Sequence, residues 1–177
     1  PPDTQTAAGG DAVQIMSIHK SKGLEFPIVV LSDLSRRFNL KENASSVLTD
    51  PALFAAGLVT DLDAGTCWPT IAHMALSDKK TRQSVAEEMR TLYVAMTRAK
   101  ERLIMTYCSA KLPAALKKWN AALTVPLRPY VSGQVRCLGG WVLMTALCRT
   151  EAGELFAVTG PNAWSRPQDS PWSIHLH

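Results

Sequence analysis

The stretch VQIMSIHKSKGLEFPIVVLSDL, residues 13–34, places two short apolar runs on either side of a tight polar turn. The first run, VQIMSI at 13–18, predicts a strand, and PIVVLSDL at 27–34 is typical of a strand buried on both faces. Ligands of open α/β sheets bind at the edge outside the carboxyl ends of strands. The stretch therefore predicts an α/β fold with a candidate ligand-binding turn at 19–26.

The turn carries the side chains that a phosphate-binding edge would need. Ser17, His19, Lys20 and Lys22 precede Gly23, so a hydroxyl, an imidazole and two ammonium groups gather within a few residues. A polar turn with solvated lysines explains the same pattern, and spacing alone favours that plainer interpretation. The turn is not a Walker A loop, because G-x-x-x-x-G-K-[ST] does not occur in the chain.

Glu25 is an acid between two large apolar residues, Leu24 and Phe26. A buried carboxylate without a partner is costly, so Glu25 should reach solvent or accept hydrogen bonds. A salt bridge to a nearby lysine and a contact with ligand hydroxyls both satisfy this requirement. The residues alone leave the two open.

A second stretch, TLYVAMTRAKERL at 91–103, ends a predicted helix over 84–100. On a wheel of about 100° per residue, Arg98 lies roughly 160° from the middle of the apolar stripe, so it should point away from the core. A plain alternative is a surface ion pair with Glu101, three residues on. The stripe consists of Val85, Met89, Leu92 and Met96.

The remaining segments give a coarser pattern. Residues 35–83 predict loops with short helices, and RLIMTYC at 102–108 predicts a third strand. Helices are expected over 113–123, where Pro113 suits a first turn, and over about 132–148. The chain thus alternates strands and helices, as an α/β domain does.

Composition sets outer bounds on the class of protein. The 177 residues are 46% hydrophobic, enough for one domain with a real core, and no apolar run is long enough to predict a membrane span. The four cysteines are far apart and form no C-x-x-C pair, so no metal site is expected. Residues 90–149 hold ten Lys or Arg against one acid, a balance of +9, whereas the remainder balances to −5. Such a block fits a surface that meets polyanions or a merely solvated basic face.

Taken together, the two motifs resemble a known family. VQIMSIHKSKGLEFPIVVL resembles motif V of superfamily 1 DNA helicases of the UvrD, Rep and RecB kind, and EEMRTLYVAMTRAKERL at 87–103 resembles their motif VI. The intervening residues 57–90 look most like AddA, the helicase and nuclease subunit of the bacterial AddAB recombination complex. The resemblance is strong over about 10–110. It implies part of a RecA-like domain, with a mainly parallel sheet flanked by helices and a helical C-terminal segment.

The resemblance also implies roles for individual residues. Arg98 matches the motif VI arginine that reaches the γ-phosphate of ATP held by the other RecA-like domain, an arginine finger. Glu25 matches the acid that contacts the ribose of ATP, and Gly23 would let the backbone approach the nucleotide. Ser17 and His19 match positions that touch the backbone of single-stranded DNA, where the family more often has Thr than Ser.

The resemblance divides the chain into a linker over 1–11, the later part of a second RecA-like domain over 12–110, and a helical extension over 111–177. The sequence contains no Walker A loop and no acidic Mg²⁺ motif, and no nuclease motif follows residue 150. We therefore expect a piece of a larger protein. The parent would bind ATP with Mg²⁺, single-stranded DNA and duplex ends, and an AddB-like subunit in the bacterial cytoplasm. The isolated piece should be inactive, and it should self-associate unless its own tail, 111–177, covers the surface left by the missing strands.

A second hypothesis is a non-catalytic nucleic-acid-binding or scaffolding module that kept the fold and lost the motor. The ATP-facing residues Glu25 and Arg98 argue against it, because a binding module has no use for them. A Walker A loop upstream in the same reading frame would separate the two hypotheses.

Overall fold

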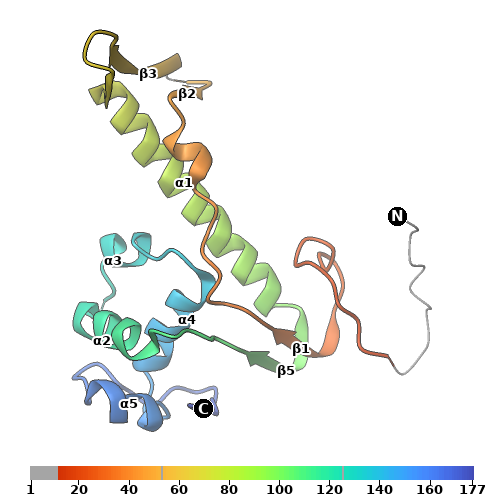
Figure 1. Ribbon diagram of the computed structural model, residues 1–177. Helices are drawn as coiled ribbons and strands as arrows, with labels where there is room; N and C mark the ends of the chain where they lie inside the picture. The colour runs from red at the N-terminus through yellow and green to blue at the C-terminus, as the bar shows by residue number, and fades with distance from the viewer. Residues whose placement is uncertain (1–11, 53, 125) are drawn as a thin grey trace.

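The computed structural model describes residues 12–52, 54–124 and 126–177. A single long helix, α1 (Ile71–Met96), runs between two small sheets, one at each end, and helices α2 to α5 pack beside its C-terminal half (Figure 1). At 1.5 Å per residue its 26 residues span about 39 Å. The predicted α/β class is confirmed.

The lower sheet holds the two motifs. Strand β1 (Phe26–Leu31) pairs in parallel with β5 (Ala99–Met105), and the two strands correspond to those predicted at 27–34 and 102–108. Alternate side chains share one face, and on it Ile28 and Val30 are 56% and 58% exposed. The prediction that this strand is buried on both faces is therefore wrong for the described residues. Its other face carries Leu31, which packs against the helical core.

The strand predicted over 13–18 is also wrong. These residues have no regular structure, and Val13 and Ile15 are 94% and 98% exposed. A strand forms only where a neighbour pairs with its backbone N–H and C=O groups. Within the described residues no strand pairs with this segment.

Residues 35–83 are more ordered than the predicted loops. They form the 3₁₀ helix η1 (Lys41–Ala44), the antiparallel strands β2 (Val47–Asp50), β3 (Phe54–Asp61) and β4 (Thr66–Pro69), and the first half of α1. The sheet β2–β3–β4 packs on α1 through a small cluster of Leu48, Ala56 and Leu76.

Helix α1 starts earlier and ends earlier than predicted. The Thr70 hydroxyl accepts a hydrogen bond from the His73 backbone N–H at 3.1 Å and caps the start, and the last helical residue is Met96. The first half was missed because its face is mostly polar and only a short sheet covers it. In the predicted stripe, Val85 and Leu92 are buried, whereas Met89 and Met96 are exposed.

The C-terminal helices form the main core with α1. Helix α2 (Leu112–Ala122) agrees with prediction, whereas the helix expected over 132–148 is two, α3 (Pro129–Gly133) and α4 (Leu138–Leu147). A short fifth helix, α5 (Gly153–Thr159), was not predicted. The side chains buried in this core are those of Val85, Leu92, Leu116, Trp119, Leu123, Val135, Trp141, Leu143, Met144, Ala146, Leu147, Ala152 and Leu155.

The last residues are fastened to this core. The buried Arg149 guanidinium forms an ion pair with Glu151 at 2.8 Å, donates to the Ser170 carbonyl and lies 4.6 Å from the centre of the Trp172 ring. Further along, Leu176 N–H donates to a Glu154 carboxylate oxygen at 2.6 Å. Among the described residues, no helix is long and apolar enough to cross a membrane.

Candidate functional site

The two sequence motifs meet at one end of the β1–β5 sheet. The Phe26 backbone N–H donates to the Arg98 carbonyl at 2.9 Å, and Phe26 pairs with Ala99 in the register of the strands. The Arg98 side chain reaches back and donates from Nη1 to the Leu24 carbonyl, also at 2.9 Å. Residues far apart in sequence are thus joined through the backbone and through one guanidinium.

Arg98 does not lie on the helix, as the wheel assumed, but in the turn between α1 and β5. Its Nε donates to the Val94 carbonyl at 2.9 Å and its Nη2 to the Thr97 hydroxyl at 3.1 Å. The side chain therefore satisfies a carbonyl in the last turn of α1, which the helix itself leaves open. In the described part of the chain Arg98 forms no ion pair with Glu101.

The Arg98 guanidinium is held by neutral acceptors. Carbonyl and hydroxyl oxygens fix its orientation, yet none of them cancels its charge. Arg98 is half-buried, so its charge is both oriented and partly shielded from water. Such a group can stabilise an anion that arrives from outside.

Of the two partners expected for Glu25, a lysine and a ligand hydroxyl, the structure contains the lysine. Its carboxylate forms an ion pair with the Lys100 ammonium at 3.2 Å, and both side chains are more than half exposed. An exposed pair of this kind contributes about 0–1 kcal/mol, so a ligand hydroxyl can replace it at little cost. Lys100 was not predicted as a site residue, because its position beside Glu25 depends on the parallel pairing of β1 with β5.

The polar turn is a compact single turn of backbone. The Ser21 hydroxyl donates to the Ile18 carbonyl at 2.7 Å, and the Lys20 N–H approaches the Ser17 hydroxyl oxygen at 3.4 Å. Gly23 ends this turn with φ of +85°, a conformation that L side chains rarely adopt. A Cβ added at Gly23 would meet nothing within 4 Å, so the space beside it is open.

The predicted site residues are gathered by the fold, but at an unexpected edge. Ser17, His19, Gly23 and Glu25 are exposed and lie on the turn that leads into β1, and Arg98 lies on the turn that leads into β5. Both turns are at the amino ends of the parallel strands. The edge was predicted from the carboxyl end of a strand over 13–18, which the structure does not contain.

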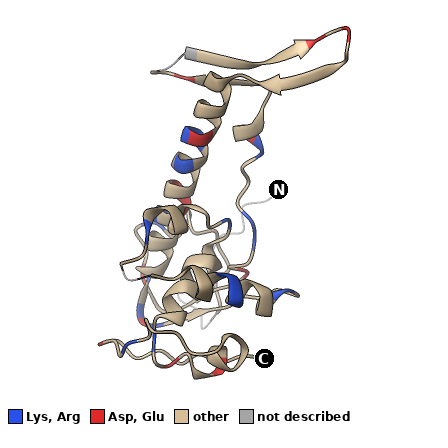
Figure 2. Cartoon of the chain, turned by 90° about the vertical axis from the view of Figure 1, so that its left-hand side faces the viewer, with Lys and Arg blue, Asp and Glu red and all other residues tan. Residues whose placement is uncertain are grey.

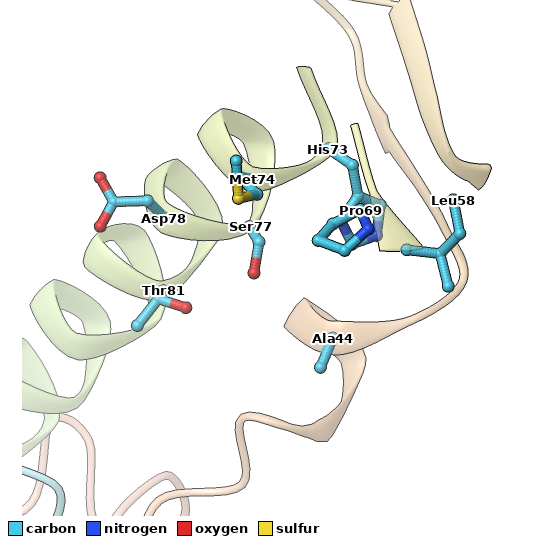
Figure 3. A pocket seen from close by; sticks show the side chains of 8 residues that line it. All are labelled: Ala44, Leu58, Pro69, His73, Met74, Ser77, Asp78 and Thr81. Carbon is cyan, nitrogen blue, oxygen red and sulfur yellow. The ribbon is translucent and has the colours of Figure 1, made fainter. Parts of the chain in front are cut away.

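A separate shallow hollow of about 420 Å³ lies near the amino end of α1 (Figure 3). His73 Nε2 lies 2.8 Å from the Ser45 carbonyl oxygen, and the Ser77 hydroxyl donates to the Asn43 carbonyl at 2.6 Å. These polar groups serve the packing of α1. The lining residues are Ala44, Leu58, Pro69, His73, Met74, Ser77, Asp78 and Thr81.

The chain is similar in sequence to bacterial helicase/nuclease subunits. It is similar to the A subunit of the ATP-dependent helicase/nuclease of Desulforudis audaxviator, with 36% identity over 99% of this chain and 15% of that protein. It is also similar to the proteins of that name from Listeria innocua, with 40% identity over 75% of this chain and 11% of the relative, and from Syntrophomonas wolfei, with 32% identity over 94% and 13%. The chain thus spans a small part, about 11–15%, of these relatives' length.

A match to a protein family covers more than half of the chain. Residues 2–110 match the UvrD-like helicase C-terminal domain, and this range contains both motifs, the polar turn and Arg98. Helices α2 to α5 lie beyond it. The chain belongs to the UvrD-like helicase C-terminal domain family.

Proposed function

We propose that this chain is part of a bacterial AddA-like helicase and nuclease subunit that hydrolyses ATP to move along DNA in the recombinational repair of double-strand breaks. The observation that carries the proposal is the joining of motif V to motif VI by the Arg98 side chain and backbone. A motor must couple its nucleotide-facing and DNA-facing residues. Here both kinds belong to one hydrogen-bonded unit.

Arg98 would face the γ-phosphate of ATP bound by a partner RecA-like domain. Its three hydrogen-bond acceptors are uncharged, so its positive charge is free to stabilise the transferring phosphoryl group. When bound, ATP supplies the free energy of translocation. Its Mg²⁺ would be held by residues outside this chain.

Glu25 and Gly23 would bind the nucleoside part of ATP. The Glu25 carboxylate can accept ribose hydroxyls in exchange for its weak pair with Lys100. The open space beside Gly23 supports a close approach of the nucleotide to the backbone. These residues bind and orient, and Arg98 contributes to the chemical step.

Ser17 and His19 would hold the phosphate backbone of single-stranded DNA. Both are exposed on the turn that ends three residues before β1. A hydroxyl and an imidazole can both donate hydrogen bonds to phosphate oxygens, so their contribution would be hydrogen bonding. The parent protein would work in the cytoplasm with an AddB-like partner.

The proposal is tested by ATP hydrolysis in the full-length protein, with and without single-stranded DNA. We expect DNA-stimulated hydrolysis that falls roughly 10³-fold in Arg98→Ala. Arg90→Ala is the control, because Arg90 is an exposed arginine on α1 that pairs with Glu87. Full activity of Arg98→Ala would refute the role of Arg98, and a wild-type protein without ATPase activity would favour the non-catalytic binding module.

A further inference from the structure

A cleft of about 690 Å³ lies at the carboxyl ends of β1 and β5, the edge opposite the turns that carry Glu25 and Arg98. Its walls are the segment after β1, the link from β5 to α2, the first turns of α2 and the residues before α4. Strands β1 and β5 separate it from Arg98 by about 20 Å, at roughly 3.3 Å per residue. It is therefore a second place, independent of the nucleotide-facing residues.

The cleft is strongly cationic. Arg37, Lys111, Lys118 and Arg136 line it, and no Asp or Glu does so among the described residues. None of the four takes part in an ion pair within the described ranges. Four like charges that converge without a counter-charge repel one another, so the arrangement is unfavourable unless an anion joins it.

Two of the four cations, Lys118 and Arg136, are placed by neutral contacts. Arg136 donates from Nη1 to the carbonyls of Gly133 and Val135, and the Lys118 ammonium lies 4.6 Å from the centre of the Trp119 ring. These contacts orient the side chains without cancelling their charge. The first turn of α2 also carries no acidic residue, so the positive end of that helix adds to the field.

Three other basic residues of the 90–149 block differ from the cleft cations, because they form ion pairs. Arg90 pairs with Glu87, Lys100 with Glu25, and the buried Arg149 with Glu151. Acidic residues lie at the opposite end of the molecule from these cations. Figure 2 shows Asp or Glu, in red, at the tip of the β3–β4 hairpin. Residues 42–78 contain five acids and no Lys or Arg, although Asp50 and Asp78 pair with Lys79 and Arg82 on α1. A polyanion would therefore be drawn to the cleft and repelled by the hairpin.

We propose that this cleft binds the backbone phosphates of a nucleic acid strand, as a contact separate from Ser17 and His19. The inference deepens the proposed function, because it assigns a second DNA contact to the same protein. Four cations spread over 690 Å³ match several phosphates along a strand better than one small anion. Because contacts with phosphates read no base edges, the cleft binds DNA without regard to sequence.

The first test compares two variants of the full-length protein that lose the same charge. The cleft variant is Arg37→Gln, Lys111→Gln and Lys118→Gln, and the control is Lys41→Gln, Lys117→Gln and Arg128→Gln, three exposed cations outside the cleft. Affinity for single-stranded oligonucleotides is measured without ATP at several salt concentrations. We expect the cleft variant to bind roughly tenfold more weakly near physiological salt, with a salt slope shallower by about 2, and the control to change little. Equal losses in both variants would overturn the proposal, because affinity would then follow net charge.

A second test needs no substitution. Acetylation of lysines in the full-length protein is measured with and without a single DNA strand of about 20 nucleotides, which is long enough to make several phosphate contacts. We expect the strand to protect Lys111 and Lys118 from acetylation but not their neighbour Lys117. Protection of Lys118 by inorganic phosphate or ATP as complete as that by the oligonucleotide would identify a small-anion site and overturn the assignment to a strand. Unchanged acetylation of Lys111 and Lys118 would overturn it too.

The two proposals fail in different ways. In the cleft variant, ATP hydrolysis at saturating DNA should equal that of the unaltered protein, because the cleft lies away from Arg98. If the full-length protein has no ATPase activity but DNA still protects Lys111 and Lys118 from acetylation, the proposed motor function is refuted and the proposed DNA contact in the cleft stands. If the protein is an active ATPase but DNA protects neither lysine, the motor function stands and the DNA contact in the cleft is refuted.

Discussion

The Arg98 guanidinium donates from Nη1 to the carbonyl oxygen of Leu24 at 2.9 Å, across 74 positions of sequence. Leu24 precedes Glu25, and its own N–H donates to the Ser21 carbonyl within the polar turn. Two hydrogen bonds therefore connect Arg98 to the turn that carries Ser17 and His19. These bonds give a physical route between the nucleotide-facing and the DNA-facing residues of the proposed motor.

The first prediction separates binding from turnover at Arg98. In full-length Arg98→Ala, ATP affinity should change by only a few-fold while turnover falls roughly 10³-fold, since the finger acts mainly in the transition state. Arg98→Lys should recover little activity, because an ammonium cannot make the three oriented bonds of the guanidinium. Nucleotide titration and steady-state hydrolysis on the same samples would check this. An equal loss of affinity and turnover would contradict it.

The second prediction concerns Ser17 and His19. Replacing both with Ala should weaken single-strand affinity by a similar factor on every sequence and leave the salt slope nearly unchanged, because neither a Lys nor an Arg is removed. Ser173→Ala with His175→Ala is a matched control: the same residue types at the same spacing, exposed, in the C-terminal tail. Titrations of the full-length protein with several oligonucleotides would test it. A loss confined to one sequence would indicate base reading instead.

The third prediction concerns Gly23, whose φ of +85° costs any other residue roughly 1–2 kcal/mol. Gly23→Ala should lower the free energy of unfolding by about that amount. Gly153→Ala, where a Cβ meets nothing within 4 Å and φ is not positive, should be neutral or slightly stabilising. Urea unfolding of the two variants gives the comparison. Equal stability of both would show that the turn relaxes without cost.

The fourth prediction is a pH dependence of the C-terminal tail. The hydrogen bond from Arg149 is the main cause that lowers the pKa of Glu151 to about 2 from 4.5. A carboxyl whose pKa is lower in the folded state stabilises it above about pH 4.5, and that stability is lost as the pH falls toward 2. The tail should therefore loosen over this range, which the fluorescence of Trp172 beside Arg149 would report.

Glu151→Gln is the control for this prediction. Its unfolding free energy should change less between about pH 5 and about pH 2.5 than that of the unaltered chain, because the titrating group is gone. An identical pH dependence in both proteins would place the effect on other carboxylates.

The fifth prediction is self-association of the 177-residue chain alone, without ATPase activity. The tail does not cover the sheet face that carries Ile28, Val30 and Ile104, which are all exposed. Uncovered apolar faces and open sheet edges attract other chains. Light scattering over a concentration series should show association that Val30→Lys weakens and Leu62→Lys, at the hairpin tip, does not. A monomeric, hydrolytically active chain would contradict the division of labour between domains.

The sequence by itself determined what depends on residue type over short distances. Glu25 and Arg98 could be selected as candidates because they match positions of two motifs that resemble a helicase family, and their roles stay predictions. The β-branched run at 27–34 predicted a strand that the structure contains as β1. Helix α2 was predictable because Pro113 favours a first helical turn and the apolar spacing continues it. Local propensity and periodicity are encoded in adjacent residues, so they can be predicted without knowledge of the fold.

Tertiary structure alone decided the features that depend on distant partners. The run at 13–18 has strand composition but no neighbouring strand among the described residues, so it stays irregular, whereas the polar first half of α1 forms a helix because the β2–β3–β4 sheet packs on it. The pair of Lys100 with Glu25 and the cleft that joins Arg37 to Lys118 follow from the parallel register of β1 and β5 and from the docking of α2. No local pattern encodes these contacts, because their free energy comes from pairing and burial between segments tens of residues apart.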